Sequence, residues 1–460
     1  MISLDNIKRI YFIGIGGIGM SALARYFAFH GKEVSGYDRT STPLTKQLES
    51  EGIPVVHHDD ENLAPKDAEM VVYTPAIPAE HRQLNFYRQN NYPLYKRSEV
   101  LGMITERSFN ICVAGTHGKT TVSTMIAHIL RDTGYGCNAF LGGISTNYNS
   151  NFWSSDRNMC VIEADEYDRS FLRLSPNLAV ITAMDADHLD IYGTEQAMQD
   201  SFIEFSGKIK SDGMLFVKEG LARMEEFRAP KKITYSLKEN ADIKAGNIRV
   251  MNGYYIFDVK VNDELIEDVA LNMGGLHNVE NASVAIGVAR QLNIETEAIK
   301  LAVEDFRGVK RRFEYIIKKK RIVYIDDYAH HPEELGTLIK SAMNLFPDKH
   351  CTVIFQPHLF SRTRDLASDF ASTLDQANEV IVLPIYPARE LPIPGVTAET
   401  ITGKMKNDNT RILDKKMTLN YLKELAAKNQ LENRLIITAG AGDIDTLVEP
   451  VKEILTANLK

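Results

Sequence analysis

The stretch Val113-Ala114-Gly115-Thr116-His117-Gly118-Lys119-Thr120-Thr121 lies between a short apolar run and an amphipathic segment. The apolar run, Ile111 to Ala114, predicts a buried strand. Apolar residues at helical spacing from Val122 to Leu130 predict a helix that ends near Gly134. Glycines in a strand-to-helix turn let backbone N–H groups approach phosphate oxygens, and a helix N-terminus supplies unpaired donors and a positive dipole end. The stretch therefore predicts a nucleotide-phosphate site.

Two side chains of this stretch carry the expected chemistry. Lys119 is expected to reach the β- and γ-phosphates, and the Thr120 hydroxyl is expected to bind Mg²⁺. The pattern is shorter than GxxxxGK[ST], because Val113 occupies the place of the first glycine. An ordinary strand-to-helix turn is the alternative, but it leaves Gly-Lys-Thr-Thr at a helix start unexplained.

Length and composition narrow the class of protein. A chain of 460 residues predicts two to four domains, and 44% apolar with 25% charged residues is typical of a folded globular protein. The net charge of −8, with one short basic run at Lys318 to Arg321, argues against nucleic acid as a partner. Neither a membrane span nor a signal peptide is expected. The four cysteines lack metal-like spacing and favour a reducing cytoplasm.

A second glycine-rich turn occupies residues 14–19, Gly-Ile-Gly-Gly-Ile-Gly. It follows a predicted strand at Ile7 to Ile13 and precedes a predicted helix at Met20 to Phe29. A second strand, Glu33 to Tyr37, ends on Asp38, so the acidic residue of the dinucleotide fingerprint is also present. The fingerprint indicates a diphosphate at a helix N-terminus and a carboxylate near a ribose. NAD, FAD and other nucleotide diphosphates all satisfy it, and a tight turn without a ligand remains an alternative.

Acidic residues follow the next predicted strand. Met159 to Ile162 is expected to be a strand, and residues 163–168 after it hold four carboxylates. So many carboxylates cannot all be buried and ionised without a cation, so a Mg²⁺ site with Glu163 as the inner ligand is expected, the alternative being a solvated acidic loop. His188 follows another strand, Leu178 to Thr182, and is either a ligand for a second cation or a capped loop histidine.

The remainder of the chain changes pattern twice. Short alternating segments from about Leu215 to Val269 predict an antiparallel insertion. Asn281 is expected one turn into the following helix, facing back toward the loop, although a helix-surface amide fits equally well. From Ile322 onward, strands and helices alternate again, and each strand ends in a polar, Gly- or Pro-containing loop. This pattern predicts a further α/β domain with its working edge at the strand carboxyl ends.

In this order, the motifs resemble those of the Mur ligases, and the likeness covers almost the whole chain. The motifs are FIGIGGIGMSALA at 12–24, TPAIP at 74–78, GTHGKTT at 115–121, EADEYD at 163–168, DADHLD at 185–190, HNVENA at 277–282, GVKRRFE at 308–314, DDYAHHP at 326–332, QPHLFSRTRD at 356–365 and TAGAGD at 438–443.

The resemblance implies an α/β fold in three domains. Residues 1–106 would form a Rossmann-like UDP-sugar domain, 107–312 a central P-loop ATPase-type α/β domain, and 313–460 a C-terminal Rossmann-like α/β domain for the amino acid. The implied reaction uses ATP and Mg²⁺ to join L-alanine to the lactyl carboxylate of UDP-N-acetylmuramate through an acyl phosphate, in peptidoglycan precursor synthesis. Attachment of a murein tripeptide to the same UDP-sugar, in cell-wall recycling, is the alternative. Monomer and homodimer both remain open.

The resemblance also implies roles for individual residues. The UDP-sugar would contact Gly14, Gly16, Gly17, Ile18, Gly19, Met20, Asp38, Thr74, Ala76 and Ile77. ATP would contact Gly115, Thr116, His117, Gly118, Lys119, Thr120, Thr121, His277, Asn278, Asn281, Arg312 and Asp327. Metal ions would be held by Thr120, Glu163 and His188, and the catalytic group would be Lys119, Glu163, His188 and Arg312. The amino acid would contact Tyr328, His330, His331, His358 and Arg362.

Two positions depart from the pattern of relatives. Leu359 directly follows Gln-Pro-His, where many relatives carry arginine, so the alanine carboxylate is expected to depend on Arg362 or Arg364. Several sister ligases carry a carbamylated lysine after the Asp-His-x-Asp motif. Here that region holds residues 203–205, Ile-Glu-Phe, and the nearest lysine, Lys208, is offset. No carbamyl-lysine is therefore predicted, as the alanine-adding branch of the family implies.

Overall fold

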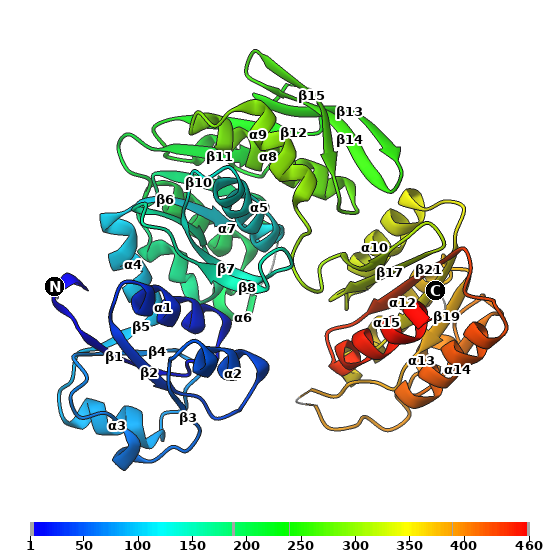
Figure 1. Cartoon of the computed structure of the whole chain (residues 1–460), viewed down its shortest axis with the longest axis horizontal. Helices are drawn as coiled ribbons and strands as arrows, with labels where there is room; N and C mark the ends of the chain where they lie inside the picture. Colours follow the sequence, from blue (N-terminus) through cyan, green and yellow to red (C-terminus); the bar gives the residue numbers. More distant parts are fainter. Residues whose placement is uncertain (1–3, 186–188, 239, 389, 458–460) are drawn as a thin grey trace. The chain divides into compact units, whose positions relative to one another are not determined.

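The computed structural model describes residues 4–185, 189–238, 240–388 and 390–457. The chain divides into two compact units. Unit 1 comprises Met1–Gly246, Asp258–Glu267 and Glu280–Val303, and unit 2 comprises Asn247–Phe257, Asp268–Val279 and Glu304–Lys460. Three β-sheets, each with helices against it, organise the described residues (Figure 1). The α/β fold class expected from the sequence is confirmed, and the three sheets correspond to the three expected domains, the first two of which lie mainly in unit 1.

The first sheet has five parallel strands in the order β3-β2-β1-β4-β5. Its strands are β1 (Arg9–Ile13), β2 (Glu33–Tyr37), β3 (Val55–Val56), β4 (Met70–Tyr73) and β5 (Leu94–Lys96), and its helices are α1 (Ile18–Phe29), α2 (Pro43–Ser50), α3 (Arg82–Gln89) and α4 (Arg97–Arg107). The strand order reverses between β1 and β4. Ligands of open α/β sheets bind at such a reversal, outside the carboxyl ends of the strands.

The central sheet has ten strands in the order β15-β14-β13-β12-β11-β10-β6-β9-β7-β8. Its strands are β6 (Phe109–Ala114), β7 (Asn138–Ser145), β8 (Ser150–Trp153), β9 (Met159–Glu163), β10 (Leu178–Ile181), β11 (Met214–Lys218), β12 (Lys232–Ser236), β13 (Ile243–Met251), β14 (Tyr254–Val261) and β15 (Glu264–Leu271). The helices of this region are α5 (Lys119–Asp132), α6 (Leu189–Tyr192), α7 (Glu195–Ser206), α8 (Leu276–Gln291) and α9 (Thr296–Asp305). The predicted strand, glycine turn and helix around residues 113–121 are confirmed as β6, loop and α5.

The predicted antiparallel insertion begins later than expected. β11 pairs in parallel with β10 and β12, and β12 pairs in parallel with β13. Two-residue links, Asn252-Gly253 and Asn262-Asp263, then join β13, β14 and β15, and neighbouring strands with such short links run antiparallel. The prediction was wrong for residues 215–236, because alternation of apolar and polar residues reports a half-exposed strand and not its direction.

The third sheet lies in unit 2 and has the order β16-β17-β21-β18-β19-β20, with β16 antiparallel and the other strands parallel. Its strands are β16 (Glu314–Lys318), β17 (Ile322–Asp327), β18 (His350–Phe355), β19 (Glu379–Val382), β20 (Thr410–Ile412) and β21 (Arg434–Ala439). Its helices are α10 (Pro332–Leu345), α11 (Phe360–Asp365), α12 (Ala367–Leu374), α13 (Glu399–Thr402), α14 (Lys415–Ala427) and α15 (Val448–Ala457). An apolar core that includes Tyr324, Ile354 and Ile436 holds this sheet to its helices.

Helix α1 joins the first two sheets within unit 1, since it lies against β7 and β8 (Figure 1). One continuous core includes Phe12 and Phe27 of the first sheet region and Phe140 and Phe152 of the central sheet. Arg25 on α1 is 7% exposed, binds Glu51 at 2.6 Å and donates to Asn151 Oδ1 at 2.7 Å. The carboxyl edge of the first sheet is thereby fixed next to the central sheet.

No described helix combines the length and the apolar character that crossing a membrane requires.

Candidate active site

The loop between β6 and α5 is shaped by two glycines with positive φ. Gly115 has φ +137°, and a Cβ there would lie 2.1 Å from Thr182 Oγ1. Gly118 has φ +83° and is the N-cap residue of α5. It has no side chain that could cap the helix, so the N-terminal N–H groups of α5 face the loop directly. Thr182 supports the loop by donating to the carbonyl oxygens of His117 and of Ala114, the latter at 3.1 Å. This geometry is suited to binding a phosphate group.

The two polar residues that open α5 each contact a carboxylate at, or just after, the carboxyl end of β9. Lys119 Nζ donates to the Gly115 carbonyl oxygen at 2.7 Å and lies 2.7 Å from both carboxylate oxygens of Glu166. The Thr120 hydroxyl donates to Glu163 Oε1 at 3.0 Å. The structure therefore brings together Lys119, Thr120 and Glu163 as expected, and it adds Glu166, for which the sequence predicted no individual role.

The other predicted side chains at this loop differ in their exposure to solvent. Thr116 is buried, and its hydroxyl oxygen accepts the N–H of Asp185 at 3.2 Å. Thr121 is buried in the first turn of α5, whereas the His117 side chain is exposed. The predicted second metal ligand, His188, lies outside the described residues.

The residues present fit a divalent cation bound beside a nucleotide. Glu163 and Thr120 offer hard oxygen donors 3.0 Å apart, which are the ligands that Mg²⁺ prefers. The Glu163 Oε2 atom also accepts the N–H of Gly142 at 2.9 Å, and this contact holds the carboxylate at the carboxyl end of β9. A Cβ on Gly142 would lie 2.2 Å from Glu163 Oε1, so only glycine leaves room for this approach.

A cavity of about 390 Å³ lies at the strand-order reversal of the first sheet. Its lining includes nine of the ten residues predicted for the UDP-sugar: Gly14, Gly17, Ile18, Gly19, Met20, Asp38, Thr74, Ala76 and Ile77. The tenth, Gly16, donates its N–H to Asp38 Oδ2 at 2.9 Å. The carboxylate predicted to face a ribose thus also closes the glycine turn.

The same cavity extends to the central sheet, because Glu163 and Asp165 belong to its wall. The other wall residues were not predicted; they include Arg97, Leu101, Phe140, Leu141 and Gly142. The sequence could have indicated Arg97, because this residue directly follows β5 at the carboxyl edge of a parallel sheet. Its Nη2 atom lies 3.9 Å from Asp165 Oδ2.

The predicted adenine contacts, His277, Asn278 and Asn281, all lie in the first two turns of α8. In unit 1, Asn281 lies beside the phosphate loop, since a Cβ on Gly118 would lie 3.2 Å from Asn281 Oδ1. In unit 2, Asn278 donates to the Gly274 carbonyl oxygen at 2.6 Å and is buried, so it stabilises the turn before α8, while His277 is exposed.

In unit 2, Asp327 ends β17 and accepts the N–H groups of Phe313 at 2.6 Å and Ala329 at 2.7 Å. Burial raises the pKa of Asp327 to about 6, although these two hydrogen bonds and the nearby Arg312 oppose the shift. Arg312 itself is exposed. Its neighbour Arg311, which was not predicted, contacts Asp326 Oδ2 at 3.3 Å.

Most residues predicted for the amino acid gather at the carboxyl ends of β17 and β18. Tyr328 and His330 have ring centroids 5.3 Å apart, and the His330 and His358 rings lie 6.0 Å apart. His358 in turn stacks on Tyr386 at 5.8 Å, a residue that was not predicted. Burial lowers the pKa of both His330 and His358, and the positive charge of Arg362 lowers it further.

Three polar atoms beside these rings are buried and have no hydrogen-bond partner among the described residues. They are Gln356 Oε1, His358 Nδ1 and Arg362 Nη1. Buried polar atoms are normally paired, so this cluster is suited to a small polar ligand. His331 is placed apart from it: it caps α10 and lines a groove between α10 and α12 together with Lys340 and Asp369.

The two departures from the family pattern have distinct structural settings. Leu359 has φ +71° and ψ 136°, an unusual backbone conformation for a residue with a side chain, and its N–H donates to the Tyr386 carbonyl oxygen at 2.9 Å. Lys208 is exposed beyond the end of α7 and pairs with Glu204 at 3.4 Å. Absence of a carbamyl-lysine stays a prediction.

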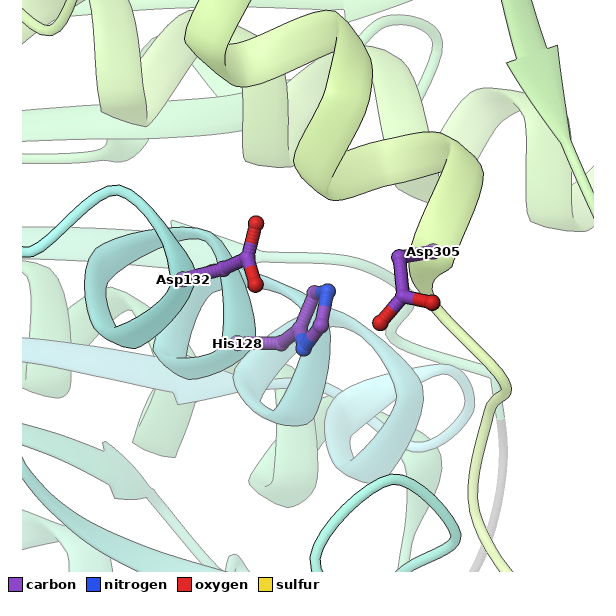
Figure 2. A group of neighbouring side chains, drawn as sticks. All are labelled: His128, Asp132 and Asp305. Carbon is purple, nitrogen blue, oxygen red and sulfur yellow. The ribbon is translucent and has the colours of Figure 1, made fainter.

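Figure 2 draws three further potential metal ligands: His128 and Asp132 on α5 in unit 1, and Asp305 at the end of α9 in unit 2. Both ring nitrogens of His128 are already engaged. Nδ1 lies 2.8 Å from the Tyr148 hydroxyl oxygen, and Nε2 lies 2.8 Å from the Ala302 carbonyl oxygen. These contacts give His128 a structural role in packing α5 against α9.

Three family models match successive parts of the chain. The model described as Mur ligase family, catalytic domain matches residues 9–109, and the Mur ligase middle domain matches residues 113–289. The model described as Mur ligase, glutamate ligase domain matches residues 311–442.

Relatives match the chain over its full length. The UDP-N-acetylmuramate–L-alanine ligase of Flavobacterium psychrophilum is 47% identical, over 98% of this chain and 99% of its own. The enzyme of the same name from Flavobacterium johnsoniae is 45% identical, over 99% of this chain and 100% of its own. The crystal structure of a UDP-N-acetylmuramate–alanine ligase from Thermotoga maritima is 28% identical, with a TM-score of 0.80 over 98% of this chain and 100% of that one. The murein peptide ligase of Psychrobacter arcticus shares the fold at 22% identity, with a TM-score of 0.64 over 97% of this chain and 98% of that one. The chain belongs to the Mur ligase family.

Proposed function

We propose that this protein is an ATP-dependent ligase that joins L-alanine to the lactyl carboxylate of UDP-N-acetylmuramate in peptidoglycan precursor synthesis. Full-length identity of 45–47% to ligases of that name is the observation that carries the proposal. The murein peptide ligase shares the fold at 22% identity, which supports tripeptide ligation less well.

The UDP-sugar is assigned to the cavity at the first sheet. Glycine N–H groups at the start of α1 suit its diphosphate, and Asp38 suits the ribose. Because Glu163 and Asp165 lie in the same cavity wall, the sugar end would approach the central sheet, where ATP is expected. The lactyl carboxylate would then be near the phosphoryl group that it receives.

ATP is assigned to the loop between β6 and α5. Lys119 would stabilise the charge that develops on the transferred phosphoryl group, and the N–H groups of the loop would fix the phosphates in place. Thr120 and Glu163 would hold Mg²⁺, with His188 proposed for a second ion. The metal supplies positive charge between the nucleotide and the carboxylate, which otherwise repel each other.

L-Alanine is assigned to the residues after β17 and β18. The guanidinium of Arg362 suits its carboxylate. His330 and His358 are candidates to accept the proton that the ammonium group must lose before attack, because their lowered pKa favours the neutral imidazole at pH 7. Attack on the acyl phosphate gives a tetrahedral oxyanion, and phosphate then leaves.

The same proposal includes domain boundaries after residues 106 and 312 and a cytoplasmic location. The end of α4 at Arg107, two residues before β6, supports the first boundary. All four cysteines are free and buried, which fits a reducing compartment.

The test is ADP release from the purified protein with ATP, Mg²⁺, UDP-N-acetylmuramate and one acceptor at a time. L-Alanine is expected to support turnover far better than the murein tripeptide. Preference for the tripeptide would instead identify the recycling reaction, and ADP release that does not depend on the UDP-sugar would overturn both.

A further inference from the structure

Glu166, three residues beyond the end of β9, is the carboxylate that faces the phosphate-loop lysine. Its side chain is 0% exposed, and the Lys119 side chain is 13% exposed. The Lys119 Nζ lies 2.7 Å from both Glu166 carboxylate oxygens. Neither the UDP-sugar cavity nor the proposed metal ligands include Glu166.

The backbone of Glu166 is held firmly in place. Its carbonyl oxygen accepts the Tyr192 hydroxyl at 2.6 Å and the Arg169 N–H at 2.9 Å. The preceding residue, Asp165, accepts the Phe171 N–H at 3.1 Å and the Ser170 hydroxyl at 2.9 Å through its carbonyl oxygen. The carboxylate of Glu166 is therefore presented to Lys119 from a rigid turn.

The hydrogen-bonding capacity of Lys119 shows what this contact does. An ammonium group has three N–H donors. The Gly115 carbonyl oxygen takes one and the Glu166 carboxylate takes a second, both at 2.7 Å. Two fixed acceptors leave a single direction for the third donor.

The charge balance argues that the pair persists when nucleotide binds. A buried carboxylate that loses its cation partner is strongly destabilised. Moving Lys119 fully onto the phosphates would break its pair with Glu166. Lys119 is therefore expected to bridge Glu166 and the phosphate rather than to exchange one for the other.

We propose that Glu166 is a positioning residue for the phosphoryl-transfer step, which holds Lys119 so that its third N–H points at the phosphate. The proposal rests on the assignment of ATP to the loop between β6 and α5. It extends that assignment by giving Glu166, the second glutamate of residues 163–168, a function separate from the metal-binding role proposed for Glu163.

Two substitutions separate position from charge. Glu166→Gln keeps an acceptor for Lys119 but removes the negative charge beside the phosphates. The affinity for a non-hydrolysable ATP analogue, measured by calorimetry, is expected to rise by about threefold or more. The kcat is expected to fall, because a charge-assisted hydrogen bond is replaced by a weaker neutral one. Glu166→Ala removes the acceptor altogether, and its kcat is expected to fall further, by about 100-fold.

Opposite changes in nucleotide affinity and kcat for Glu166→Gln, with an unchanged KM for the UDP-sugar, are not expected of a residue that only supports the fold. Glu379→Gln is the matched control. Glu379 is also a buried carboxylate, 1% exposed and 2.6 Å from Arg434, but it lies in unit 2 on β19. Its substitution is expected to lower the melting temperature without this kinetic pattern.

A double substitution tests whether Glu166 acts through Lys119. In the Lys119→Ala background, Glu166→Ala is expected to cause no further loss of the residual ADP release. A further loss, or a Glu166→Gln variant that changes only thermal stability, would overturn the proposal. If Glu166→Ala does not fold, the analogue affinity and the kcat of Glu166→Gln alone test the proposal. Analogue affinity is measured without an acceptor, so an incorrect acceptor assignment would leave this test intact and appear only in the turnover assay.

Discussion

At the scale of single residues, the ammonium of Lys119 is the group on which turnover is proposed to depend. It stands at the first position of α5 with its charge already paired, and the neighbouring Thr120 reaches a different carboxylate. Two adjacent side chains thus contact two different carboxylates, those of Glu166 and Glu163. One is fully buried beside a cation, and the other lies in the wall of a cavity.

Lys119→Ala is expected to lower kcat by about 1000-fold or more, because transition-state charge on the phosphoryl group loses its partner. The dissociation constant for UDP-N-acetylmuramate, measured by calorimetry, is expected to stay unchanged, since Lys119 does not line the cavity proposed for the UDP-sugar.

Lys210→Ala serves as the control for the loss of an ammonium in the same unit. Lys210 donates to the carbonyl oxygens of Thr105 and Ser108 at 3.2 and 3.1 Å. Its loss is expected to lower stability and to spare kcat. Loss of UDP-sugar binding in Lys119→Ala would contradict the separation of the two nucleotide sites.

Asp326 in β17 provides a pH-dependent contribution to stability. Burial raises its pKa to about 6, and hydrogen bonding from Thr438 and the charge of Arg311 oppose the shift. The folded pKa exceeds the unfolded value of about 4, so the folded state binds the proton more tightly. This residue therefore destabilises the fold as pH rises from about 4 to about 6, by an amount on the order of 3 kcal/mol.

Asp326→Asn is expected to reduce that pH dependence. Amide hydrogen exchange in β17 and β21, corrected for the intrinsic rate, should show protection falling between about pH 4 and about pH 6 in the wild type and falling less in the variant. Equal slopes in the two proteins would contradict the assignment. Asp327 retains its own pH dependence in both.

At the scale of elements, α5 has a glycine with positive φ near each end, and the two have different consequences. Gly115, in the loop before the helix, packs directly on Thr182 of the segment after β10. Gly134, after the helix, has φ +72°, and a Cβ there would meet no described heavy atom within 4 Å. The first glycine is required by packing and backbone conformation together, and the second by backbone conformation alone.

Gly115→Ala is expected to lower the affinity for an ATP analogue by about tenfold or more, since the added methyl group would displace Thr182 and the loop it supports. Gly134→Ala is the matched control, with an expected cost of about 1 kcal/mol in stability and unchanged nucleotide affinity. Calorimetric titration and thermal denaturation of both variants make the comparison. Equal nucleotide affinity in the two variants would show that the loop tolerates the displacement.

At the scale of the whole molecule, each of the three sheets presents functional candidates at the carboxyl ends of its parallel strands. The loops after β1 and β4 line the cavity proposed for the UDP-sugar, and the loops after β17 and β18 hold the histidines. In the central sheet, Lys119 opens the helix that follows β6, Glu163 ends β9 and Glu166 lies just after it. This division suits a reaction with three substrates, because each sheet supplies one set of contacts.

The proposed route through an acyl phosphate predicts the fate of an oxygen atom. With ¹⁸O in the lactyl carboxylate of UDP-N-acetylmuramate, one labelled oxygen should appear in the released phosphate, because the carboxylate attacks phosphorus and the amine then displaces phosphate. Mass spectrometry of the phosphate gives the measurement. Unlabelled phosphate from a full turnover would exclude the route.

Local sequence alone determined the two glycine turns, the helices that start after them and the α/β class, because a strand, a turn and a helix start involve contiguous residues. Tertiary structure decided the features that join distant segments. Lys119 meets Glu166 across 47 positions, and Arg25 meets Asn151 across 126. The parallel direction of β11 and β12 depends likewise on sheet order. No local pattern specifies such contacts, since they arise from the packing of whole elements against one another.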